Sequence, residues 1–154
     1  MENNNSKVID KLDHLISIAE DGEKGYENAA KDVEDYEMKN LFSRLSHERS
    51  SYVRQLKAQV GTYGERIEKG NGGPLGAVHR VLMDLSSVFT SGDKDAIIKA
   101  CLTGEDAALK NYKEALEETY ISGKEREILS EQYIGIQNAI TSIKDHMSME
   151  GLKS

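Results

Sequence analysis

The chain has 154 residues, which is enough for one domain with a buried core and too few for two ordinary domains. Its 27 acidic and 20 basic residues give a formal net charge of −7, and this charge disfavours nucleic acids and anionic membranes as partners because both reward a basic face. With one Pro, no Trp and two Phe, the composition favours helices over a sheet.

The sequence shows no targeting or membrane signal. Residues 1–11, MENNNSKVIDK, lack the apolar core of a signal peptide, and no apolar run approaches the ~20 residues that span a bilayer. The single cysteine, Cys101, excludes an internal disulfide, and its place in an apolar stripe predicts a small buried hydrophobe. We therefore expect one cytoplasmic domain over residues 1–154, with flexible tails at 1–5 and 149–154.

The first half of the chain predicts a helical hairpin. Ser6 is a candidate N-cap for a helix that runs to about Val33. Asp35 is the candidate N-cap of the next helix, whose apolar residues continue to Val60. The break between the two helices is so short that they must pair antiparallel.

A glycine-rich connection follows this hairpin. Residues 61–73, GTYGERIEKGNGG, contain five glycines and predict a flexible crossover. Pro74 suits the first turn of a short extra helix over residues 74–89. The sequence Ser-Gly-Asp at 91–93 then ends that helix.

The last third of the chain predicts a second antiparallel hairpin. A helix runs from about Asp93 to Tyr120, and a capping-box pattern of Ser122 with Glu125 opens a final helix that reaches about Met147. Four long helices and one short helix predict an all-α four-helix bundle, with the short helix on the crossover connection.

Carboxylates stand within the apolar faces of the helices. Glu105 lies in the stripe that contains Cys101 and Tyr112, where an unpaired charge is costly. Glu23 falls on or near the inward face of the first helix, and Glu48 borders the stripe of the second. Gly-Glu at 22–23 and again at 104–105 occupies the first arm of each hairpin, which indicates a weak internal repeat.

Two inward Glu residues are half of a carboxylate di-metal site. A bundle site of this kind takes one Glu from each of two helices and a Glu-x-x-His from each of the other two, because residues i and i+3 share a helix face. Oxygen ligands with a few imidazoles suit iron or manganese.

Four segments of the chain resemble the ferritin-like superfamily, and more closely a bacterial ferritin-like family catalogued only as a domain of unknown function. The resemblance covers about Val8 to Ile143 and implies a ferritin-type four-helix bundle built from two antiparallel hairpins. Relatives are linked to stress responses, without an established biochemical activity. The segments are GYENAAKDVED (25–35), LFSRLSHER (41–49), LGAVHRVLMDL (75–85) and GEDAALKNYKEAL (104–116).

The di-metal ligand set of the superfamily carries over only in part. Glu23 and Glu105 match the single Glu of the first and third bundle helices. In the second helix, alignment places Arg49 at the Glu position and Tyr52 at the His position, whereas a shift by one places Glu48 at the Glu position. Neither alignment supplies a His.

The last helix also departs from the pattern. Gln137 and Ile140 stand near the depth where the second Glu-x-x-His belongs, and Glu131 is followed three residues later by Ile134. The four histidines are scattered and predict no site; they are His14, His47, His79 and His146.

We therefore predict a core polar cluster rather than a metal centre, with Arg49 supplying the positive charge that a metal would bring. No catalytic residue, metal or other cofactor is expected. If a metal binds, its ligands are Glu23, Glu48 and Glu105. The predicted members of the cluster are Glu23, Glu48, Arg49, Tyr52, Glu105, Tyr112 and Gln137.

Three functional hypotheses follow. The first is a non-enzymatic, stress-associated bacterial bundle protein with a degenerate di-metal site, which acts through interactions or as a homodimer. The alternative is a carboxylate-based protein that binds iron, manganese or zinc, with oxidase or storage-type chemistry. A third is a small-molecule pocket in the bundle core.

Overall fold

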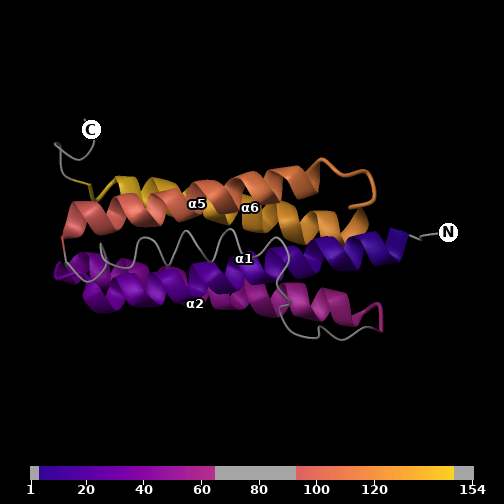
Figure 1. Ribbon diagram of the computed structural model, residues 1–154, viewed down its shortest axis with the longest axis horizontal. Coiled ribbons are helices and arrows are strands. Elements are labelled where there is room, and N and C mark those ends of the chain that lie inside the picture. Colours follow the sequence, from indigo (N-terminus) through magenta and orange to yellow (C-terminus); the bar gives the residue numbers. More distant parts are fainter. Residues whose placement is uncertain (1–3, 65–92, 148–154) are drawn as a thin grey trace.

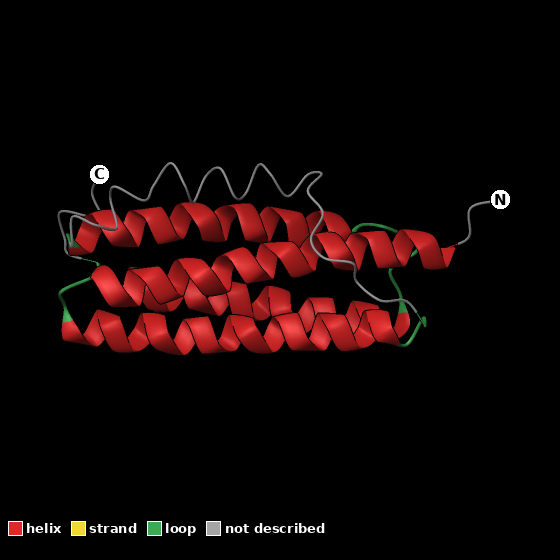
Figure 2. Ribbon diagram, turned by 60° about the horizontal axis from the view of Figure 1, so that its bottom comes forward, coloured by secondary structure: helices red, strands yellow, loops and turns green. Residues whose placement is uncertain are grey.

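The computed structural model describes residues 4–64 and 93–147. Within these ranges the chain forms four α-helices and no strand, arranged as one elongated bundle (Figures 1 and 2). The prediction of an all-α four-helix architecture is therefore confirmed. The predicted short helix over 74–89, most of the crossover, and the tail over 149–154 lie outside the described residues. The helices are α1 (Asn4–Asp32), α2 (Tyr36–Gly61), α5 (Lys94–Leu116) and α6 (Gly123–Lys144).

Side-chain caps define where two of the helices begin. The Asp35 carboxylate accepts a hydrogen bond from the Met38 backbone N–H at 2.9 Å, which confirms the predicted start of α2. Asp93 caps α5 in the same way through the backbone N–H of Ala96. α1 begins at Asn4, so the predicted N-cap Ser6 lies inside the helix.

The second hairpin differs from its prediction at the turn. α5 ends at Leu116 rather than Tyr120. Ser122 occupies the N-cap position of α6 but makes no side-chain cap hydrogen bond. Glu125 is buried and accepts a hydrogen bond from Gln59 of α2, so its carboxylate links two helices instead of closing a capping box.

The four helices lie at the corners of a square in cross-section. α1 packs on α2 and on α5, and α6 packs on α5 and on α2, so α2 and α5 face each other across the diagonal. Both hairpins are antiparallel, and α2 and α5 run in the same direction (Figure 1). The end of α2 and the start of α5 therefore lie at opposite ends of the bundle.

Two apolar clusters fill the interior, one toward each end of the bundle. The first joins the N-terminal half of α1, the C-terminal halves of α2 and α5, and α6 around Leu12, Leu56 and Leu129. The second joins the opposite helix ends around Phe42 and Ile97. The boundary between the two clusters lies at mid-bundle, and this is where Arg49 and Glu105 are buried. None of the four described helices combines the length and the apolarity needed to cross a membrane.

Candidate functional site: a buried polar layer

A salt bridge between Arg49 and Glu105 occupies the centre of the bundle. The Nη1 group of Arg49 donates to Oε1 of Glu105 at 2.7 Å, and the Nη2 group donates to Oε2. Arg49 is 2% exposed and Glu105 is 3% exposed. Because Arg49 lies on α2 and Glu105 on α5, this bidentate salt bridge spans the diagonal of the bundle.

Aromatic rings enclose the guanidinium group. The Cζ atom of Arg49 lies 5.4 Å from the ring centroid of Tyr26 on α1 and 5.8 Å from that of Tyr52 on α2. Both distances fall within the range of cation–π attraction. The positive charge is thus stabilised by a carboxylate and two ring faces in place of water.

A second set of hydrogen bonds extends the layer to α6. Tyr112 Oη donates to Oε1 of Gln132 at 2.7 Å. The Nε2 group of Gln132 donates to Oε1 of Gln55 at 2.9 Å and approaches the backbone carbonyl of Tyr52 at 3.4 Å. Gln132 is 1% exposed, so its buried amide is satisfied by partners on α2 and α5.

Two glycines make room for these large polar side chains. A Cβ atom at Gly22 on α1 would lie 2.9 Å from Nη1 of Arg49. A Cβ atom at Gly135 on α6 would clash with the hydroxyl of Tyr52. The absence of a side chain at these two positions is what lets Arg49 and Tyr52 reach the centre.

Burial and charge shift the protonation of the layer. Burial raises the pKa of Tyr52 to about 12, and the nearby carboxylate of Glu48 contributes. Burial also raises the pKa of Tyr26 well above its ordinary value. Burial alone would lower the pKa of Arg49, but the Glu105 carboxylate more than offsets this and the net shift is upward. The layer therefore holds one ion pair and neutral phenols at pH 7.

A cavity of about 40 Å³ lies beside the ion pair, between α1 and α5. Two buried polar atoms of lining residues, Tyr26 Oη and Arg49 Nε, have no hydrogen-bond partner among the described residues. The predicted burial of Cys101 is confirmed, and burial raises the pKa of its thiol far above neutrality. The described lining comprises Ile18, Asp21, Gly22, Gly25, Tyr26, Arg49, Ala100, Cys101, Gly104, Glu105 and Ala108.

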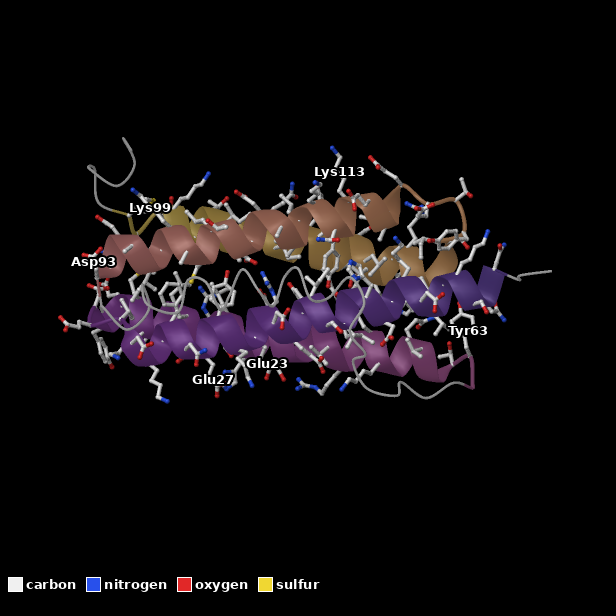
Figure 3. The ribbon with its side chains drawn as sticks, viewed as in Figure 1. Glu23, Glu27, Tyr63, Asp93, Lys99 and Lys113 are labelled. Carbon is white, nitrogen blue, oxygen red and sulfur yellow. The ribbon has the colours of Figure 1, made fainter. Side chains whose placement is uncertain are left out.

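The structure brings together four of the seven residues predicted for the polar cluster. Arg49, Tyr52, Glu105 and Tyr112 are all buried at mid-bundle. Glu23 is only half-buried and lies toward the outer side of the α1–α2 hairpin (Figure 3).

Two further predicted members are not part of the buried centre. Glu48 is half-buried, and its carboxylate lies near enough to Tyr52 to raise the pKa of that phenol. Gln137 is exposed and does not belong to the cluster. The buried face of α6 passes through Gln132 and Ile136, and a residue one step beyond Ile136 is turned by about 100° toward solvent.

Two members of the layer were missed in the sequence. Gln132 lies four residues before Ile136, on the same helix face, and this spacing is the signal that identifies it. Tyr26 has the spacing of an apolar residue in α1, and nothing in this spacing shows that a guanidinium group lies over its ring.

The donors around Glu105 do not fit a di-metal centre. Its two oxygens are both paired with Arg49, and the side chains near it include phenols and a thiol whose pKa values are raised. Within residues 4–64 and 93–147, no three His, Cys, Asp or Glu side chains are grouped in a way that suits a metal ion.

Comparison with known proteins gives one match. No curated protein and no solved structure matches the chain. A family model described as a domain of unknown function matches residues 7–118, which is most of the chain and covers α2, α5 and all but the start of α1. The chain therefore belongs to the family with the domain of unknown function DUF2383.

Proposed function

We propose that this protein is a bacterial ferritin-like bundle in which a salt bridge has replaced a di-metal centre, and that it is not an enzyme. The observation that carries the proposal is the pairing of both Glu105 oxygens with the Arg49 guanidinium at the bundle centre. A fixed cation in this position repels a second cation and already neutralises the carboxylate.

The helix arrangement supports the ferritin-like part of the proposal. The two hairpins are antiparallel, and the first ends at the opposite end of the bundle from the start of the second (Figure 1). Bundles with one long crossover share this arrangement, whereas simple up-and-down bundles do not.

The chemistry of the layer supports a role without catalysis. Burial raises the pKa of the Cys101 thiol and of the Tyr26 and Tyr52 phenols, so these groups stay protonated at pH 7. Protonated thiols and phenols are poor nucleophiles and poor general bases. A function through contacts with other molecules is therefore the better-supported class.

Self-association is the first contact that we propose. The four helices are amphipathic, and Ile134 on α6 leaves 54% of its surface exposed. We expect a homodimer, and light scattering on the purified protein should give twice the chain mass of 17.1 kDa. A mass of one chain across the concentration range would refute the dimer. The association with stress stays a prediction.

Metal analysis tests the central part of the proposal. Protein produced with added iron, manganese or zinc should retain less than stoichiometric metal after mild chelation. Glu105→Ala and the matched variant Glu23→Ala should give the same low metal content. Stoichiometric iron or manganese that survives chelation in the wild type and in Glu23→Ala, but is lost in Glu105→Ala, would show the carboxylate-based metal protein instead.

A further inference from the structure

The outer face of the α1–α2 hairpin carries a row of carboxylates on α1. Three glutamates follow one another at steps of three and four residues, and this spacing places them on one side of the helix. Figure 3 shows two of them, Glu23 and Glu27, on the side of the hairpin that faces away from α5 and α6. We call these three residues the acidic row; they are Glu20, Glu23 and Glu27.

A row of basic side chains runs beside it on α2. Arg44, His47 and Arg54 are all exposed, and at about 100° per residue they lie within about 80° of one another around the helix. We call these three residues the basic row. Charges of the opposite sign border both rows only at the edges of the face: Lys24 and Lys31 lie toward α5, and Glu48 lies toward α6.

Most charges of the two rows have no partner within the described part of the chain. One salt bridge touches the rows, between Glu20 and Lys57 at 3.4 Å, and both of its side chains are about half exposed. Arg54 donates a hydrogen bond to Ser50 of its own helix. The remaining charged members form no salt bridge among the described residues, so they are available to charges from another molecule.

The heights of the two rows match under a two-fold axis. The Ser46 hydroxyl donates to the backbone carbonyl of Glu23 at 2.9 Å, so these two residues lie at about the same height of the antiparallel hairpin. The acidic row therefore stands at about the level of positions 49, 46 and 42 of α2. A two-fold axis perpendicular to the face, at the level of His47, superposes these heights on those of the basic row to within about two residues, or about 3 Å.

We propose that this face of the α1–α2 hairpin is the interface of a two-fold symmetric homodimer, in which the acidic row of each copy lies against the basic row of the other. Glu20 meets the partner's Arg44, and Glu27 meets the partner's Arg54. Because a two-fold interface uses the same patch on both copies, each of these pairs occurs twice. Arginine and carboxylate form the strongest exposed pairs because both can bind through two atoms.

The pattern selects a second copy of this chain as the partner. A different protein would need the same two rows in the same order and spacing, whereas a second copy already carries them. The net charge of −7 on each chain opposes association in general, but this repulsion is screened over ~8 Å at physiological salt, while the paired side chains lie closer than this. The exposed Ile134 does not mark a competing apolar patch, since its neighbours on α6 are Glu131, Gln137 and Asn138, all exposed and polar.

The experiment is sedimentation equilibrium of the full-length protein at about 150 mM NaCl, where only close charges interact strongly. Glu27→Arg and Arg54→Glu each turn two attractive pairs into repulsive ones and should raise the dimer dissociation constant at least about tenfold. The double variant Glu27→Arg with Arg54→Glu exchanges the two charges and should restore most of the affinity. Lys113→Glu makes the same charge change as Arg54→Glu on α5, on the opposite side of the view in Figure 3, and should leave the dissociation constant unchanged.

The outcomes separate this inference from the homodimer of the proposed function, on which it rests. A monomeric wild type contradicts the homodimer itself. A dimer that survives both single variants, or that the double variant does not restore, overturns only the interface on α1 and α2. Loss of the dimer in Ile134→Ser, with no effect of the charge variants, would overturn it in favour of α6. If a single variant does not fold, Glu20→Arg and Arg44→Glu, alone and combined, test the second pair in the same way.

Discussion

The Gly-Glu pairs at 22–23 on α1 and at 104–105 on α5 look alike in sequence but have opposite roles in the structure. On α5 the carboxylate of Glu105 points into the core and pairs with Arg49, while a Cβ at Gly104 would meet nothing within 4 Å. On α1 the glycine faces the guanidinium group, and Glu23 is half-buried at the side of the bundle.

The two pairs differ in which residue faces the centre of the bundle, the first on α1 and the second on α5. On α1 the residue that faces Arg49 is Gly22, and Glu23 is turned from it by about 100°, whereas on α5 the second residue of the pair faces the centre. A repeated dipeptide therefore does not place equivalent groups at equivalent positions. One arginine neutralises the single carboxylate that points inward. Two inward carboxylates would need a second cation.

The largest expected contrast is between the two glutamates. Glu105→Ala leaves the Arg49 charge buried without a partner and should lower the free energy of unfolding by about 3–5 kcal/mol. Glu23→Ala should cost less than about 1 kcal/mol, since its carboxylate forms no salt bridge among the described residues. Urea denaturation measures the free energy of unfolding of both variants. Equal losses would contradict the assignment of Glu105, and not Glu23, to the buried salt bridge.

The two glycines should respond with opposite signs. Gly22→Ala puts a methyl group 2.9 Å from Nη1 of Arg49, whose position is fixed by Glu105, and should destabilise the protein by about 1–2 kcal/mol. Gly104→Ala places its methyl group in open space within a helix and should stabilise by about 0.5–1 kcal/mol. Thermal unfolding measures the stability of both variants against the wild type. Stabilisation by Gly22→Ala would mean that the guanidinium group is free to move.

Alkaline pH distinguishes the buried layer from the surface. Because burial raises the pKa of Tyr52 to about 12, the folded protein holds a proton that the unfolded chain releases near pH 10. The proton on Tyr52 therefore adds to the free energy of unfolding. This stabilisation is complete below pH 10 and is lost as the pH rises toward 12, so that the free energy of unfolding falls by about 1 kcal/mol at pH 11. Denaturation at pH 9 and 11 measures the loss. Tyr52→Phe should reduce it, whereas Tyr36→Phe, at a position 75% exposed, should not.

The smallest change is expected when the pair is removed as a whole. Arg49→Met combined with Glu105→Met replaces the salt bridge by apolar groups that join the two hydrophobic clusters. Such replacements are often neutral or stabilising, so we expect stability within about 1 kcal/mol of the wild type, or above it. A loss of more than about 3 kcal/mol by the double variant would show that the pair is needed for folding.

The sequence was sufficient for the helices because their signals are local. The apolar spacing from Met38 to Val60 and the cap at Asp35 lie within a few turns of one another, and both predictions are confirmed. Membership of a domain-of-unknown-function family is likewise confirmed, whereas the ferritin-like relationship stays a prediction.

The site was harder to predict because its contacts join residues far apart in the chain. The cost of a charge in an apolar stripe identifies Glu105, and alignment with the di-metal pattern, which puts Arg49 at a Glu position, identifies Arg49. Gln132 and Gln137 both stand at mid-helix, and the choice between them depends on the rotation of α6 against α2 and α5. That rotation is set by packing across the bundle, which no local pattern encodes.

The most direct test of the central claim is a crystal structure of protein grown with manganese, with anomalous data collected near the manganese absorption edge. The account predicts Arg49 Nη1 and Nη2 on the Glu105 oxygens and no anomalous peak at mid-bundle. A peak with oxygen ligands at about 2.0–2.2 Å, including Glu105 and with Arg49 displaced, would contradict it.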